Sequence, residues 1–154
     1  MTATVNSKHQ DDALALADEL RPVLHRLYRQ LRRESEDLNR GVSPLQNLLL
    51  AAIIEHPGIG VADLARIEKL RGPTISGHVK RLESAGLIAR AAPLSEDRRR
   101  VGLMATARGR GSIEAIKRRR RDWLAHQLAN MSFAARRTIR KALGPLSEIG
   151  GGLP

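Results

Sequence analysis

The chain has 154 residues and no cysteine, so disulfide bonds, thiolate metal sites and thiol-based redox sensing are excluded. Hydrophobic residues make up 42% of it, which predicts one compact globular module with a helical extension. The formal net charge of +11 at pH 7 predicts attraction to polyanions. Because only three residues are aromatic, the core has to be built from Leu, Ile, Val and Ala.

The positive charge is concentrated in one third of the chain. From Arg71 to Arg121 there are 14 lysine and arginine residues against four acidic ones, which favours a binding face over a uniformly hydrated surface. No apolar run is long enough for a membrane span, and residues 1–10 lack the charged-then-apolar layout of a signal peptide. A cytoplasmic protein without membrane contact is therefore expected.

The first segment, 1–10, is polar and without periodicity, which predicts a flexible tail. A long helix is predicted at 12–41, where Pro22 indicates either a kink or a break because it has no amide hydrogen to donate. Gly41 is expected to end this helix in the left-handed conformation. The apolar residues recur every three or four positions, as Leu16, Leu20, Leu24, Leu27 and Leu31.

Three shorter helices and a hairpin are predicted over 43–105. Ser43 and Pro44 are a favourable N-cap and first residue for a helix that ends near His56. Its expected buried stripe is Leu45, Leu48, Leu49, Ala52 and Ile53. Two further helices are expected at 62–69 and 74–84, with inward-facing Leu64, Ala65 and Ile67 in the first and Ile75, Val79 and Leu82 in the second.

Residues 87–90 and 101–104 are typical of two short antiparallel strands. Thr106 and Ser132 predict the N-caps of two helices within 106–149, one at 107–129 and one that Gly144 and Pro145 interrupt, and residues 150–154 are expected to fray. The predicted fold class is mainly α with a small two- to three-stranded β wing. Helix, turn, helix and hairpin is the order of a winged helix-turn-helix lobe.

The strongest motif is the segment VADLARIEKLRGPTISGHVKRLESA at 61–85. Two short helices with a tight link allow the first to brace the second in the major groove, where each base pair shows a distinct pattern of donors and acceptors. The second helix has one apolar face and one small, polar and basic face; the latter holds Thr74, Ser76, Gly77, His78, Lys80 and Arg81. Taken alone, this segment also fits an ordinary amphipathic helix pair.

Three arginines, Arg98, Arg99 and Arg100, follow Asp97 at the predicted hairpin tip. A narrow minor groove concentrates negative potential, so an arginine projecting from such a tip is attracted into it. Asp97 is close enough in sequence to pair with Arg99 and orient its guanidinium group. A solvated run of charge is the alternative interpretation.

The segments SPLQNLLLAAI, VADLA, PTISGHVKRLESAGLIAR, SEDRRRVGL and TARG follow one another as the corresponding segments do in the MarR family of bacterial regulators. The chain resembles this family over about 12–146. The resemblance implies a homodimer held by the helices at 12–41 and 106–149, a pseudo-palindromic double-stranded DNA operator, and a repressor. It also implies that a small effector, such as an aromatic or phenolic acid, binds between the dimer helices and the lobe and releases the DNA. No cofactor is expected.

By the same resemblance, Thr74, Ser76 and His78 would read bases, Lys80 and Arg81 would contact phosphates, and Arg99 would probe the minor groove. Three residues depart from the family pattern. Gly77 stands where many members carry arginine, Arg71 stands where a capping serine is common, and Gly102 is expected to loosen the second strand. Constitutive DNA binding without a ligand response remains the alternative function.

Other functions have less support in the sequence. Ser76 and His78 are two residues apart on a helix, so their side chains diverge and cannot form a nucleophile and its base. The five histidines show no close pairing for a metal site, and the basic segment lacks the aromatic residues on which an RNA-binding module stacks bases. The basic run at 117–121 is left open between a solvated face, an accessory DNA contact and pairing with a partner chain.

Overall fold

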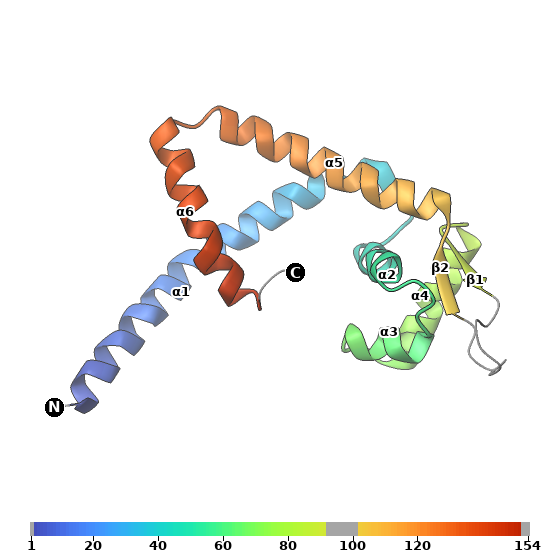
Figure 1. The fold of residues 1–154 in the computed structure, drawn as a ribbon, viewed down its shortest axis with the longest axis horizontal. Coiled ribbons are helices and arrows are strands. Elements are labelled where there is room, and N and C mark those ends of the chain that lie inside the picture. Colours follow the sequence, from blue (N-terminus) through green and yellow to red (C-terminus); the bar gives the residue numbers. More distant parts are fainter. Residues whose placement is uncertain (1, 92–101, 152–154) are drawn as a thin grey trace. The chain divides into compact units, whose positions relative to one another are not determined.

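The computed structural model describes residues 2–91 and 102–151 and is mainly helical, with a two-stranded antiparallel wing (Figure 1). This confirms the expected fold class. The elements are α1 Thr2–Arg33, the short 3₁₀ helix η1 Glu36–Asn39, α2 Pro44–Glu55, α3 Val61–Ile67, α4 Gly72–Ser84, β1 Ile88–Ala91, β2 Gly102–Ala105, α5 Ala107–Ala129 and α6 Phe133–Ile149.

The chain divides into two compact units, which we name the lobe, residues 35–118, and the terminal unit, residues 1–34 and 119–154. Every residue that is buried in the described part of the chain belongs to the lobe. The lobe therefore has its own hydrophobic core, which is supplied by α2, α3, α4, both strands and the first half of α5; its members include Leu49, Leu50, Ile53, Leu64, Ile75, Leu82, Leu103 and Ile113.

Helix α2 begins with a capping box, in which Ser43 Oγ accepts the amide hydrogen of Gln46 and Gln46 Oε1 accepts that of Ser43. Its buried stripe differs from the expected one: Leu48 is 50% exposed, whereas Leu50 is fully buried. The prediction was wrong here because α2 is apolar almost all round, so two overlapping stripes of helical period fit the sequence equally well.

Helices α3 and α4 pack on α2 and on each other. The expected burial of Ile75, Val79 and Leu82 in α4 is confirmed. In α3 the expectation fails for Ile67, which is 45% exposed. Ile67 is the last residue of α3, one turn after the buried Leu64, so it shares the inner face but stands at the end of the helix.

The wing strands pair antiparallel, with Ile88 opposite Ala105 and Ala91 opposite Gly102. The turn between α2 and α3 adds a short third pairing, because Leu103 N donates to Ile59 O and Leu103 O accepts from Gly58 N, both at 2.9 Å. Gly102 was expected to loosen its strand. Instead, the strand passes so close to this turn that a Cβ on Gly102 would lie 2.6 Å from Gly58 O, so only glycine fits.

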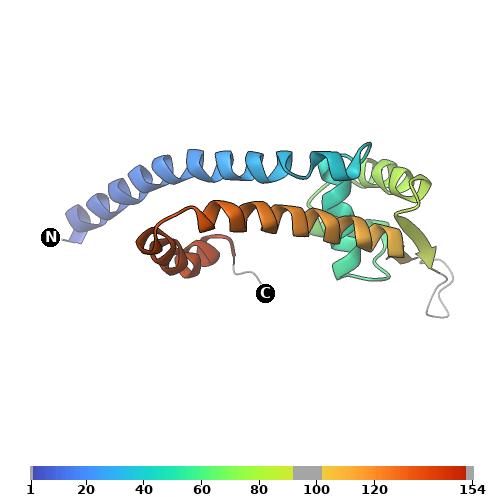
Figure 2. The ribbon, with the colours of Figure 1, turned by 90° about the horizontal axis from the view of Figure 1, so that it is seen from above.

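The bounds of the first and last helices differ from those that the sequence pattern predicts, whereas α5 has the predicted bounds. Helix α1 already begins at Thr2 and contains Pro22; it is bowed rather than broken (Figure 2). It ends at Arg33, before η1, so Gly41 has the expected left-handed φ of +88° but closes a separate turn. Helix α6 continues through Pro145 to Ile149, because a proline removes one hydrogen bond without forcing a helix to end.

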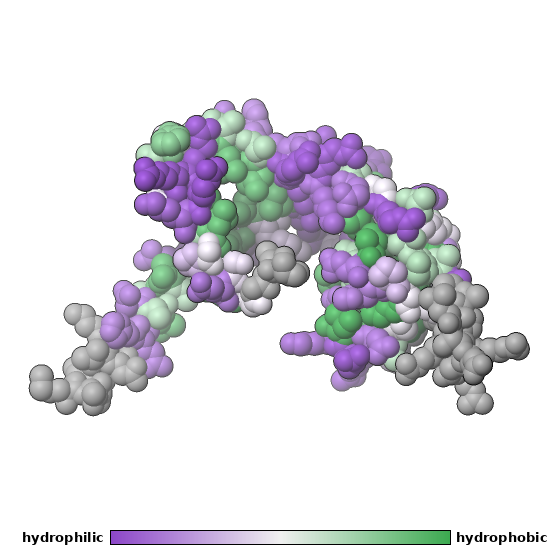
Figure 3. Space-filling view, viewed as in Figure 1, coloured by the Kyte–Doolittle hydropathy of each residue, from purple (hydrophilic) through white to green (hydrophobic). Residues whose placement is uncertain are grey.

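The terminal unit exposes a large apolar surface (Figure 3). None of its described side chains is buried, and α5 is tied to the end of α1 by a hydrogen bond from Arg119 Nε to Glu34 O. On α6, Phe133 is 75% exposed, Leu143 60% and Ile149 76%. Helices with such apolar faces are not stable in water unless another surface covers them.

Candidate nucleic-acid interface

Helix α4 presents one buried and one exposed face. Pro73 stands in its first turn, where the missing amide hydrogen has no cost, and Arg71 is its N-cap without a side-chain hydrogen bond, as the departure from the usual serine indicated. Because Ile75, Val79 and Leu82 fix the inner face, the opposite side of the helix is directed to solvent. This orientation leaves the polar side of α4 free to contact a ligand.

The predicted contact residues lie on the exposed half of α4. Thr74, Ser76, Gly77, Lys80 and Arg81 are all exposed. They form two edges, since residues three, four or seven apart share a helix face. Thr74 and Arg81 lie along one edge, and Ser76 and Lys80 along the other. The helix therefore brings a hydroxyl and a cation together on each edge, a pairing suited to a duplex groove and its flanking phosphates.

His78 differs from its neighbours because it is only partly exposed. Its Nδ1 is buried and has no hydrogen-bond partner among the described residues. A base contact by this ring would therefore have to come from Nε2. The sequence pattern placed His78 on the polar face of α4 but did not indicate that its Nδ1 is buried.

Gly77 occupies the middle of the exposed face, between the two edges. A Cβ built on it would meet nothing within 4 Å, so no neighbouring atom requires a glycine here. A bare backbone at this point allows close approach of a second molecule. The middle of the exposed face of α4 is thus open rather than filled by a side chain.

An ion pair that the sequence did not indicate joins α4 to the wing. Arg90 Nε on β1 donates to Glu83 Oε1 on the last turn of α4 at 2.8 Å. Both side chains are partly exposed, so the stabilisation is at most about 1 kcal/mol. Its effect is geometric, because it links the helix to the strand that leads towards the wing tip. The tip itself, with Asp97, Arg98, Arg99 and Arg100, lies outside the described residues.

The start of α5 is hydrogen-bonded to the turn that follows α4. Thr106 Oγ1 donates to Gly86 O at 2.8 Å and accepts the amide hydrogen of Gly109 at 3.0 Å, which confirms Thr106 as the N-cap. Helix α5 approaches the chain so closely that a Cβ on Gly109 would overlap the carbonyl oxygen of Leu87. These contacts hold the start of α5 against the turn between α4 and β1, and we name this place the α4–α5 joint.

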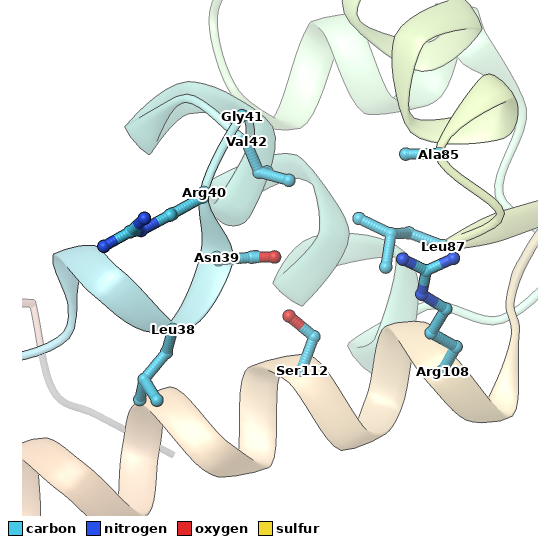
Figure 4. Close-up of a pocket in the computed structure, with 9 residues that line it drawn as sticks. All are labelled: Leu38, Asn39, Arg40, Gly41, Val42, Ala85, Leu87, Arg108 and Ser112. Atoms are coloured by element: carbon cyan, nitrogen blue, oxygen red, sulfur yellow. The ribbon is translucent and has the colours of Figure 1, made fainter.

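A cleft of about 520 Å³ lies beside this joint, within the lobe. Figure 4 shows the carbonyl oxygen of Asn39 and the hydroxyl of Ser112 directed into it, with the guanidinium of Arg108 near Leu87. Asn39 Nδ2 is occupied by a hydrogen bond to Asn47 Oδ1, and Ser112 Oγ is buried without a partner among the described residues. The lining therefore includes two arginines, Arg40 and Arg108, the hydroxyl of Ser112 and apolar side chains, and none of the lining residues is acidic.

The basic run at 117–121 is engaged in several local contacts. Lys117 pairs with Glu114 at 3.3 Å and Arg121 with Asp122 at 3.0 Å, both on exposed surface. Among the described residues, no group of three or more His, Asp or Glu side chains is placed to hold a metal ion. Nor is any helix of that part long and apolar enough to cross a membrane.

Comparison with known proteins agrees with this geometry. A family model described as MarR family matches residues 40–100. An uncharacterised HTH-type transcriptional regulator of Mycobacterium bovis is 29% identical over 132 residues, which are 86% of this chain and 90% of the relative.

Two solved structures are similar. The crystal structure of RV1404 from Mycobacterium tuberculosis is 25% identical, with a TM-score of 0.82, over 92% of this chain and 96% of that one. A mutant of MepR from S. aureus, bound to an oligodeoxyribonucleotide, is 21% identical with a TM-score of 0.68, over 86% of this chain and 96% of that one. Residues 40–100 of the chain therefore match the MarR family, and most of the chain is similar to HTH-type transcriptional regulators.

Proposed function

We propose that the protein is a homodimeric repressor that reads a pseudo-palindromic operator and is released from it by a small organic acid. The exposed polar face of α4 carries this proposal, because a buried apolar side holds that face outwards from a rigid lobe. The MepR mutant bound to an oligodeoxyribonucleotide has the same fold, which supports DNA as the partner. A bound repressor acts by occupying the promoter and excluding polymerase.

In this proposal α4 lies in the major groove. Thr74, Ser76 and the Nε2 of His78 read base edges, and Lys80 and Arg81 contact the phosphates on either side. Gly77 allows the helix backbone to approach the groove closely. The hairpin carries Arg98, Arg99 and Arg100 to the adjacent minor groove, where Asp97 orients Arg99. The pairing of Ala91 with Gly102 supports a hairpin across this segment.

The second copy of the chain covers the apolar faces of the terminal unit. These faces lie on α1 and α6, and the unit has no buried residue among those described. A symmetric dimer lets each helix contact its own counterpart or the other terminal helix, which buries both faces at once. Two lobes held in this way would read the two halves of a palindrome.

The cleft beside the α4–α5 joint is our candidate for the effector site. Arg108 would bind the carboxylate of an organic acid, Ser112 Oγ would donate to it or accept from its hydroxyl, and Leu38, Val42 and Leu87 would enclose its apolar part. Ala85 and Leu87 belong to the turn that follows α4. A ligand here would therefore shift the helix that reads the DNA.

The DNA-binding proposal is tested with fluorescence anisotropy on the DNA upstream of the protein's own gene. We expect Arg99→Ala to cost about 1–3 kcal/mol of operator affinity at fixed salt. Lys80→Ala is expected to weaken specific and non-specific binding alike and to reduce the slope of log Kd against log salt by about one unit. An unchanged affinity would remove Arg99 from the interface, and a loss confined to one sequence would make Lys80 a base reader. A wild-type protein that binds heparin as well as duplex DNA would contradict the proposal itself.

The effector proposal is tested by adding a panel of aromatic and other organic acids to the same complex. For an acid that releases the wild type, Arg108→Gln is expected to raise the half-effective concentration about tenfold, because a charge-assisted hydrogen bond is lost. Arg118→Gln, which removes an exposed charge of the lobe away from the cleft, is the control. If no acid affects the complex, DNA binding is constitutive; if both variants respond as the wild type does, the effector binds elsewhere.

A further inference from the structure

Five described residues have a positive φ, and four of them are glycines. The fifth is Lys69, with φ of +52°, in the link between α3 and α4. A side chain in this left-handed conformation crowds the following carbonyl group, which glycine avoids. Lys69 is thus the point in the described chain where the sequence departs from the residue that its backbone favours.

The same backbone motif ends both α3 and α4, so the lysine and the glycine in its left-handed position can be compared within one chain. At the end of α3, Leu70 N donates to Ala65 O at 2.9 Å and Lys69 N to Arg66 O at 3.3 Å. This pair of bonds is the Schellman arrangement, in which the left-handed residue is usually glycine.

Helix α4 ends with the same two bonds, from Leu87 N to Leu82 O and from Gly86 N to Glu83 O, and there the left-handed residue is Gly86. The left-handed residue of this motif is therefore lysine at the end of α3 and glycine at the end of α4.

Nothing within the described chain compensates for the lysine. Its side chain is exposed and takes part in no ion pair there, whereas the nearby Arg66 is paired with Asp63 at 2.9 Å. The link at 68–71 leads directly into α4, whose polar face begins at Thr74. In a helix-turn-helix the first helix crosses the DNA backbone while the second lies in the groove, so the link between them passes beside the phosphates.

We propose that Lys69 binds a DNA phosphate. This contact explains why a lysine stands at a position where glycine would be less strained. The proposal rests on the proposed DNA binding by α4 and adds a contact residue to it. It implies that folding and DNA binding place opposite demands on this position. Glycine is better for the folded lobe, and a cation is better for the complex.

The test is the substitution Lys69→Gly, because its two effects have opposite signs. The thermal midpoint is expected to rise by about 2–4 °C, since the backbone strain is relieved. The Kd for operator DNA near 0.1 M salt is expected to increase about three- to tenfold, and the salt slope to fall by about one unit. Lys69→Arg keeps the charge and should bind as the wild type does, and Lys141→Gln controls for the loss of an exposed charge on α6.

Each outcome decides the matter. If Lys69→Gly binds DNA with the affinity and salt slope of the wild type, or if its affinity falls with an unchanged slope, Lys69 makes no ionic contact and the inference is overturned. A lower thermal midpoint would show that the lysine stabilises the lobe itself, which overturns it as well. A wild type without preference for duplex DNA would instead remove the proposed function, so the two failures are distinguishable.

Discussion

Gly109→Ala is expected to lower the free energy of unfolding by about 3 kcal/mol, although alanine is normally the better helix residue. The reason is the close approach of α5 to the turn after α4. The added methyl group would overlap Leu87 O and lie 3.2 Å from Leu50 Cδ1 in the core. Relief of that overlap requires a shift of α5, which would strain the bonds of Thr106 to Gly86 and Gly109.

The control for this substitution is two residues along the same helix. Gly111 is exposed, and a Cβ on it would meet nothing within 4 Å. Gly111→Ala should therefore raise the free energy of unfolding by about 0.5–1 kcal/mol, through helix propensity alone. Urea denaturation followed by circular dichroism measures both. A Gly109→Ala protein as stable as Gly111→Ala would mean that α5 and Leu87 do not approach as the structure has them.

The two glycines also show where sequence reasoning reaches its limit. The N-caps at Ser43, Thr106 and Ser132 were predictable, because a capping side chain acts on an amide two or three residues away. The need for glycine at 102 and 109 depends on backbone from elsewhere in the chain, at Gly58 and Leu87. The residues beside Gly102 in the sequence do not indicate such a contact, so Gly102 was expected only to loosen its strand.

The candidate interface divides in the same way. The polar face of α4 followed from the spacing of three apolar residues, and the structure has them buried as expected. The burial of His78 Nδ1, the bond between Glu83 and Arg90, and the conformation of Lys69 did not follow, because each depends on packing or on a backbone angle. The wing-tip residues 97–100 were predicted from sequence and stay a prediction.

A charged residue on α6 is expected to separate the proposed dimer. Leu143 is 60% exposed and shares a face with Ile139 and Leu146. Leu143→Lys would place two ammonium groups in an otherwise apolar interface, one from each copy, and burying an unpaired charge costs several kcal/mol. We expect the variant to sediment as a monomer at micromolar concentration, where the wild type sediments as a dimer.

The same variant should lose about a hundredfold in affinity for a full palindrome, because a monomer gives up the second, tethered contact. Lysine is the informative replacement, since the added positive charge favours DNA and cannot itself explain a loss. The control is Glu148→Lys, which adds positive charge on the opposite side of α6. The monomer should also bind a half-site as well as it binds the full palindrome. A Leu143→Lys protein that remains dimeric would remove α6 from the interface, and a monomer that still binds the palindrome at wild-type affinity would show that the two half-sites are not read by one dimer.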